Sequence, residues 1–170
     1  MGKLEKLVDS PAGMEGFRAK YCIPPGVGLE YCSLEEVLIK RKMGQVAIQM
    51  IAFVDGGMTI PMGRITRDYL RGHRLAPHQC VASMFRILGC IDALNKQINL
   101  DLSWHNVVHL YECHCLNESY YLKSGSDKVR LIFCLPKSNK GLKDDLLIVS
   151  RAWHDGIHCP VRAGTPGGVL

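Results

Sequence analysis

The stretch between Pro61 and Pro77 constrains the fold more than any other part of the sequence. Its residues 63–74 follow a helical period, with arginines on one side and apolar residues on the other. Because proline breaks a helix interior and disfavours helical geometry in the residue before it, the two prolines bound this segment. We therefore predict a short amphipathic helix that buries its apolar side and exposes its arginines.

Two further amphipathic segments follow and are also predicted to be helices. Residues 77–96 begin with a proline, which suits a first helical turn, and their apolar positions cover about half of the helix circumference. Asp101 or Ser103 can cap a third helix over residues 104–115. We expect the helix over residues 77–96 to be the most buried of the three.

The rest of the chain combines one short helix with several strands. Ser33, followed three residues later by Glu36, has capping-box spacing and predicts a helix that ends at residues 40–42. The apolar stretch 46–54 shows neither period and fits a strand or a short buried helix. Strands are predicted over residues 18–22, 120–123, 129–135 and 146–153. The predicted fold class is α+β, with a core of about three helices followed by a small antiparallel sheet.

The length of 170 residues predicts a single domain, because one domain typically has about 150 residues. Residues 1–16 are polar, contain glycine and proline and show no period, so we expect a flexible tail there. Residues 160–170 are rich in the same two residue types and are expected to form a second flexible tail. The predicted domain therefore spans residues 17–159.

The apolar segments of the chain indicate its compartment. The longest one, residues 46–54, is well short of the roughly 18 apolar residues that a membrane span needs, so we expect no membrane association. No apolar stretch follows Lys3 and Lys6, which predicts the absence of a secretory signal. The eight cysteines are therefore expected to be thiols in a cytoplasmic or nuclear protein.

Positive charge is concentrated in one segment of the chain. Residues 61–90 hold five arginines, no lysine and one acidic residue, Asp68. Four of these arginines share one side of the predicted amphipathic helix: Arg64, Arg67, Arg71 and Arg74. Guanidinium groups pair well with phosphate and carboxylate oxygens, so this side is our candidate surface for a nucleic acid or a protein partner. The alternative is a solvated helix face whose arginines pair with Asp68 and with acids from elsewhere.

A weaker candidate is a metal site on the third predicted helix. His105 and His109 are four residues apart, and Cys113 falls on the same side, so the three could contribute to a structural zinc site. A metalloprotease is excluded, because Asn106 occupies the position where the HExxH motif requires glutamate. No cysteine pair has the two-residue gap of a zinc knuckle. The prediction is therefore that the chain has no metal and no cofactor.

Enzyme motifs are missing from the sequence. It contains no GxSxG nucleophile elbow, no GxxxxGK phosphate loop and no GxGxxG dinucleotide motif. We assign no catalytic residue and predict a protein that is not an enzyme.

Three stretches of the sequence resemble a known family: GGMTIPMGRITRDYLRGHRLAPHQCVASMFRILGCIDALN at residues 56–95, YYLK at 120–123 and LPKSNKGLKDDLLIV at 135–149. Their order is similar to that of the gypsy-type transposon domain of plants, the gag-like amino-terminal region of retrotransposon-derived proteins. That pattern has a Gly-apolar-Pro step, a helix, a Pro-x-Gln turn, an Arg-Ile-Leu helix and a lysine-containing loop before an apolar strand. YCIPPG at residues 21–26 is similar to its start, and the resemblance covers residues 17–159.

The resemblance implies a non-enzymatic interaction or assembly module derived from a transposable element, with self-association as one form of assembly. It carries over no catalytic residue. Sequence-independent nucleic-acid binding through the arginine helix face is the first alternative, and a structural zinc-binding protein is the second. The sequence lacks a CCHC zinc knuckle and an Asp-Ser/Thr-Gly protease motif, which other proteins of such elements carry.

Overall fold

The computed structural model describes residues 2–126, 131–133, 135, 142 and 144–151. The helices are α1 (Pro11–Lys20), α2 (Leu34–Lys40), α3 (Met50–Val54), α4 (Arg64–Gly72), α5 (Ala82–Ile98) and α6 (Trp104–Leu110). The strands are β1 (Val27–Ser33), β2 (Val46–Gln49), β3 (Tyr111–Leu116), β4 (Ser119–Ser124) and β5 (Asp145–Arg151), and two 3-10 turns are η1 (Glu5–Leu7) and η2 (Pro77–Gln79). These elements confirm the predicted α+β class.

The larger sheet is antiparallel and has the order β1-β5-β2. Its central strand, β5, lies opposite β1 in the register Leu29 to Val149 and opposite β2 in the register Ile48 to Leu147. Five successive β5 residues from Asp145 are buried, as expected for a strand covered on both faces. The prediction that the sheet follows the helices is therefore wrong in part. In the chain, β1 and β2 come before α4, α5 and α6, and β5 comes after them.

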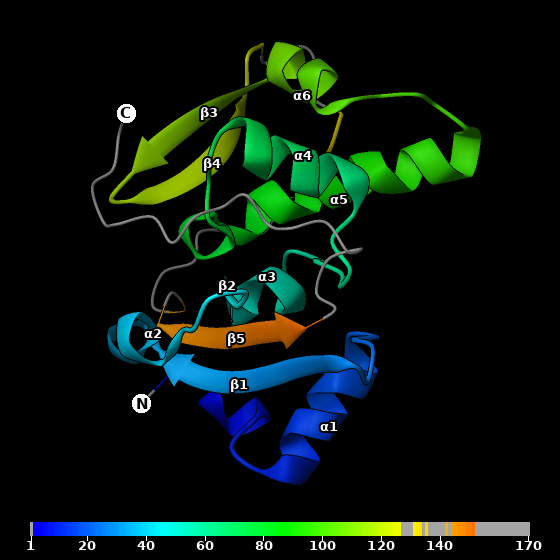
Figure 1. Cartoon of the computed structure of the whole chain (residues 1–170). Coiled ribbons are helices and arrows are strands. Elements are labelled where there is room, and N and C mark those ends of the chain that lie inside the picture. The colour runs from blue at the N-terminus through cyan, green and yellow to red at the C-terminus, as the bar shows by residue number, and fades with distance from the viewer. Residues whose placement is uncertain (1, 127–130, 134, 136–141, 143, 152–170) are drawn as a thin grey trace.

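The helices and the sheet share one hydrophobic core. α3 contacts both β5 and α5 and lies between the sheet and the layer formed by α4 and α5 (Figure 1). The buried cluster runs from Phe17 of α1 through Phe53 of α3 and Phe85 of α5 to Leu122 of β4. Phe17 and Phe53 meet edge to face, with ring centroids 5.8 Å apart. Among the residues described, no helix has the length and hydropathy needed to cross a lipid bilayer.

The amino-terminal segment differs from the prediction. The expected flexible tail over residues 1–16 contains η1 and the first half of α1, and the expected strand over residues 18–22 is the end of α1 and the turn after it. The Ser10 side chain accepts a hydrogen bond from the Gly13 amide at 3.1 Å and caps α1. Burial of Phe17 then anchors α1 to the core, which a local polar composition does not indicate.

The capping box predicted from Ser33 and Glu36 is confirmed at the start of α2. The Ser33 amide donates to a Glu36 carboxylate oxygen at 3.0 Å, and the Glu36 amide donates to Ser33 Oγ at 3.4 Å. Lys40 Nζ lies 2.9 Å from the same carboxylate. The hydrogen bond from the Ser33 backbone, followed by that from Lys40, lowers the pKa of Glu36 from 4.5 to about 2.

This lowered pKa predicts an acid-sensitive contribution to stability. Because the Glu36 pKa is lower in the folded than in the unfolded chain, its stabilising effect is full above pH 4.5 and is lost as the pH falls toward 2. We expect Glu36→Gln to reduce the loss of stability over this range, measured by urea unfolding at several pH values. Glu35→Gln, at an exposed neighbouring position, is the control. Identical pH profiles for wild type and Glu36→Gln would contradict the assignment.

The ambiguous apolar stretch 46–54 contains both of its predicted alternatives. Residues 46–49 form β2 and residues 50–54 form α3. All residues from 46 to 53 are buried, so the two elements share a continuous apolar composition. A periodicity signal is absent there because every side is covered.

The helix predicted over residues 77–96 is interrupted near its start. η2 occupies residues 77–79, and α5 begins only at Ala82. Between them, the Val81 amide donates to the Tyr120 carbonyl of β4 at 3.0 Å. This tertiary hydrogen bond takes Val81 out of the helix.

The third predicted helix is correct only in its first half. α6 ends at Leu110, and residues 111–116 form β3, which pairs with β4 in an antiparallel hairpin. Asn117 and Glu118 connect the strands with φ values of 49° and 62°, the positive values that a tight type I′ turn requires. Cross-strand pairing therefore overrides the helical pattern after Leu110.

The remaining strand predictions have mixed outcomes. β4 confirms the strand over residues 120–123, and β5 confirms the one over 146–153 as far as residue 151. Residues 131–133 and 135 are not in a strand, so the prediction over 129–135 is wrong at these positions. Residues 152–153 and the carboxyl-terminal tail at 160–170 lie outside the described residues.

Candidate interaction surface

The predicted amphipathic helix is α4, and its apolar side is buried as expected. Ile65, Tyr69 and Leu70 are each at most 2% exposed. No side chain of the segment before α4 caps its first turn. Instead, Asp92 of α5 accepts hydrogen bonds from the backbone amides of Ile65 at 3.0 Å and Thr66 at 3.4 Å. A carboxylate at this end also complements the helix dipole, so Asp92 fixes α4 against α5.

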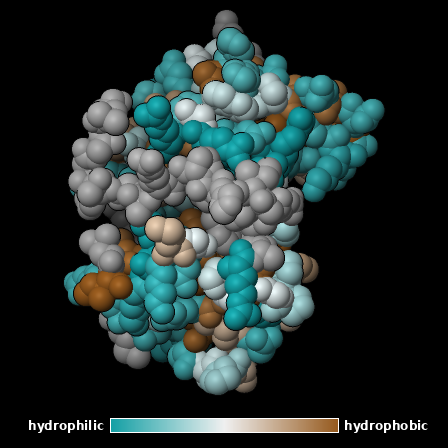
Figure 2. All heavy atoms as spheres, viewed as in Figure 1, coloured by the Kyte–Doolittle hydropathy of each residue, from teal (hydrophilic) through white to brown (hydrophobic). Residues whose placement is uncertain are grey.

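The four predicted arginines lie on and just after α4, outside the core, and we call Arg64, Arg67, Arg71 and Arg74 the arginine surface. Three of them, Arg64, Arg67 and Arg71, form ion pairs. Arg64 is the most exposed of these, with 53% of its side chain accessible, against 39% for Arg71 and 20% for Arg67. Arg74 is also exposed. Figure 2 shows hydrophilic residues over the α4 and α5 part of one face of the molecule.

Among the described residues, two carboxylates lie beside these arginines. Asp68 is 3.7 Å from Arg67 Nε and 3.9 Å from an Arg71 nitrogen, while Asp101 is 3.4 Å from Arg64. Among the residues that the structure describes, these two carboxylates contact Arg64, Arg67 and Arg71, and neither contacts the exposed Arg74. The exposed pair of Arg64 with Asp101 contributes only about 0–1 kcal/mol, so another anion can compete for the Arg64 guanidinium group. The sequence alternative of a partly paired helix face is thus correct for three of the four arginines.

The fifth arginine of the segment, Arg86, has a structural position. Its Nε donates to the backbone carbonyl of Asp55 at 3.1 Å. This bond ties α5 to the turn after α3, and a Cβ on the neighbouring Gly57 would be 3.5 Å from the guanidinium group. The count of five arginines therefore overstates the charge that a partner can reach.

An aromatic cluster borders the arginine surface and was not identified from the sequence. The rings of Tyr69 and His73 stack at 4.2 Å, and His73 meets Trp104 edge to face at 5.8 Å. Trp104 and the exposed His105 are 4.0 Å apart at the start of α6. A Cβ on Gly72 would lie 2.7 Å from the Trp104 ring, so the glycine permits this close approach. The cluster depends on the packing of α6 against α4, which local sequence does not encode.

The zinc candidates are separated by the end of α6. His105 and His109 are exposed on α6, whereas the half-buried Cys113 is on β3 and packs against the core. Within the part of the chain that the structure describes, no three His, Cys, Asp or Glu side chains form a group that could hold a metal ion. The hypothesis of a site built from these three residues is therefore wrong.

The cysteines that the structure describes are free thiols. Cys80 is buried as predicted, Cys90 is half-buried, and Cys134 lies outside the described residues. Burial raises the pKa of the Cys32 thiol to about 11. Burial, together with the neighbouring Cys113, also raises the pKa of the Cys80 thiol. These two thiols are inert, in keeping with their interpretation as small core residues.

Comparison with known proteins yields no relative: no family model, no curated protein and no solved structure matches the chain.

Proposed function

We propose that this chain is a non-enzymatic interaction module, in the cytoplasm or the nucleus, that binds an acidic protein segment through the arginine surface. The observation that carries the proposal is the row of arginines on the outer side of α4, with Arg64 and Arg74 exposed, while the inner side of the helix is fixed in the core. An acidic segment of a second copy would give self-association. The resemblance to the gag-like transposon domain is in keeping with such an assembly role.

The position of the two carboxylates favours a protein partner. Asp68 and Asp101 lie beside Arg64, Arg67 and Arg71 and would repel the evenly spaced phosphates of a nucleic acid. A protein segment need not follow the spacing of a phosphate backbone and can place a carboxylate at the exposed Arg74, which neither Asp68 nor Asp101 contacts. The sequence pI of about 8.8 is also below the value above 9 that is typical of nucleic-acid-binding domains.

Sequence-independent nucleic-acid binding is the second candidate, because the Trp104 and His105 rings lie next to this surface. Aromatic rings beside guanidinium groups can stack on bases while the cations contact phosphates. This candidate differs from the first in its salt dependence. Each neutralised phosphate contributes about −0.9 to the slope of log affinity against log salt.

The test measures binding of a glutamate-rich peptide and of single- and double-stranded DNA and RNA at low and at physiological salt. We expect the peptide to bind more tightly than oligonucleotides of equal charge. Arg71→Ala with Arg74→Ala should weaken its binding roughly three- to thirtyfold, since each exposed ion pair contributes up to about 1 kcal/mol. Lys20→Ala with Lys42→Ala removes the same charge from exposed positions elsewhere and is the control.

The outcomes distinguish the two candidates. Tighter binding of an oligonucleotide, with a steep salt dependence that the arginine variant reduces, would replace the protein partner by a nucleic acid. Equal binding by wild type and the arginine variant would contradict both.

A further inference from the structure

A cavity of about 170 Å³ lies between α5, the start of α4 and the loop over residues 57–63. Its walls include Met58, Met62 and Phe85, which are each at most 7% exposed. A dry apolar cavity of about 150 Å³ is large enough to bind benzene. The cavity is therefore of the size of one aromatic ring.

Hydrogen bonds on both sides hold the walls in place. On one side, the Met58 amide donates to the Ala52 carbonyl at 3.0 Å, and Thr59 Oγ1 donates to the Pro61 carbonyl at 3.2 Å. On the other side, Asp92 holds the first turn of α4 through its amides and through Thr66 Oγ1 at 3.4 Å. These bonds fix the loop and the helix independently of a ligand, so the cavity is formed before anything enters it.

The polar groups of the wall are largely occupied by these bonds. Both carboxylate oxygens of Asp92 accept hydrogen bonds from α4, and its negative charge faces the positive end of that helix. Thr59 and Thr66 use their hydroxyl groups on Pro61 and Asp92. The interior therefore selects an apolar group, to which the flexible methionine side chains can adapt.

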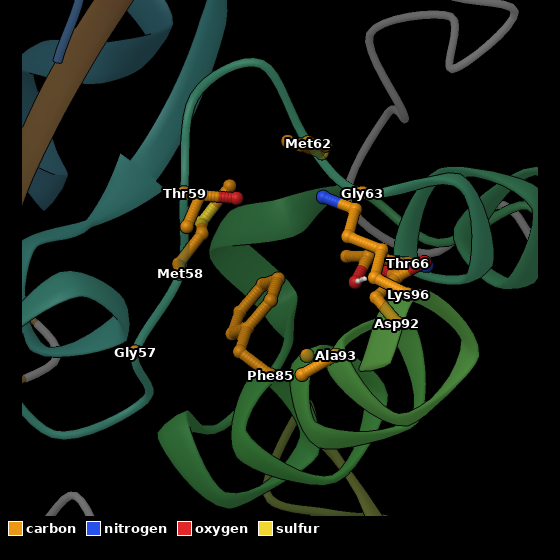
Figure 3. Close-up of a pocket in the computed structure, with 11 residues that line it drawn as sticks. Gly57, Met58, Thr59, Met62, Gly63, Thr66, Phe85, Asp92, Ala93 and Lys96 are labelled. Carbon is orange, nitrogen blue, oxygen red and sulfur yellow. Dashed lines mark hydrogen bonds between the residues drawn. The ribbon is translucent and has the colours of Figure 1, made fainter. Parts of the chain in front are cut away.

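Lys96 lies at the open side of the cavity, one helical turn beyond Asp92. Figure 3 shows its side chain extending from α5 toward the loop that carries Met58 and Met62, while the Phe85 ring points into the space between them. Among the described residues that line the cavity, Lys96 carries the positive charge. A ligand with its ring inside can thus place an anionic group next to Lys96.

We propose that this cavity binds a small aromatic carboxylic acid, with the ring between Phe85 and the two methionines and the carboxylate at Lys96. This site is separate from the arginine surface and does not depend on the function proposed for it.

The test uses benzoate as the probe and toluene and benzylamine as its neutral and cationic counterparts. Methionine methyl groups are labelled and followed by NMR, because an aromatic ligand shifts the resonances of methyl groups next to its ring. We expect saturable shifts at Met58 and Met62 with benzoate and toluene. No shift is expected at Met43, which is fully exposed.

Two sets of variants locate the ligand. Gly89→Leu fills the cavity from α5, where, among the described residues outside the helix, a Cβ would meet the Gly57 carbonyl alone at 3.9 Å. This variant should abolish binding of both probes. Ala93→Leu narrows the cavity from an exposed position of the same helix and serves if Gly89→Leu does not fold. Lys96→Gln should weaken benzoate about two- to fivefold and leave toluene unchanged, while Lys42→Gln, at a remote exposed lysine, should change neither.

Three results would overturn the proposal. They are the absence of saturable shifts at Met58 and Met62, undiminished binding in the filled variants, and benzylamine binding as tightly as benzoate. An unchanged benzoate affinity in Lys96→Gln would overturn the assignment of the carboxylate position.

Discussion

Replacing Phe85 by alanine is expected to lower the free energy of unfolding by about 3–5 kcal/mol, the range for a buried aromatic residue. Phe85 is 1% exposed and belongs to the main core cluster. Its ring also borders the cavity at α5, so the truncation enlarges an existing space that the surrounding backbone cannot close. Urea or thermal unfolding measures the loss.

Phe133→Ala is the matched control for this prediction. Phe133 is 71% exposed, and we expect its truncation to change the free energy of unfolding by less than about 0.5 kcal/mol. Similar losses in the two variants would contradict the assignment of Phe85 to the core.

Gly56→Ala is the second change with a large expected effect, a loss of about 1–3 kcal/mol. A Cβ on this buried glycine would meet the Ala82 carbonyl at 3.0 Å and, at closer range, the Ala52 carbonyl. Both contacts are with backbone at the junction of α3 and α5, which cannot move aside as a flexible side chain could. Equilibrium unfolding of the purified variant checks the value.

Gly16→Ala makes the same chemical change with the opposite expected sign. Gly16 is exposed within α1, and a Cβ there would have no described atom outside the backbone of α1 within 4 Å. Alanine is favoured over glycine inside a helix by about 0.5–1 kcal/mol, so the variant should be more stable than wild type. An unchanged stability of Gly16→Ala would indicate that residues 11–20 are not helical in solution. A Gly56→Ala variant as stable as wild type would contradict the packing described at Gly56.

The parts of the fold that the sequence predicts are those that local patterns determine. The period of residues 63–74 gives α4 and its arginine side, and the capping box at Ser33 gives the start of α2. The continuous apolar run of β5 predicts a strand that is buried on both faces. Each of these signals lies within one element, so no knowledge of its neighbours is required.

The failures arise where a distant residue decides the local structure. α1 depends on the contact of Phe17 with Phe53, and α5 starts late because Val81 bonds to Tyr120. Asp92, 27 residues after Ile65, accepts the hydrogen bonds that cap α4. Gly63, at the N-cap position, has no side chain to accept them. The same long-range placement brings Asp101 to Arg64 and Trp104 to Gly72, which changes the charge and the shape of the arginine surface.

The salt dependence of binding tests the proposed interaction surface most directly. For whichever acidic ligand binds, log affinity is measured against log salt for wild type, for Arg71→Ala with Arg74→Ala and for Lys20→Ala with Lys42→Ala. The proposal predicts that log affinity falls less steeply with log salt for the arginine variant only. The reason is that the ligand displaces bound solution ions at these arginines and not at the two lysines. An equal slope in all three proteins, or an equal reduction in both variants, would contradict it.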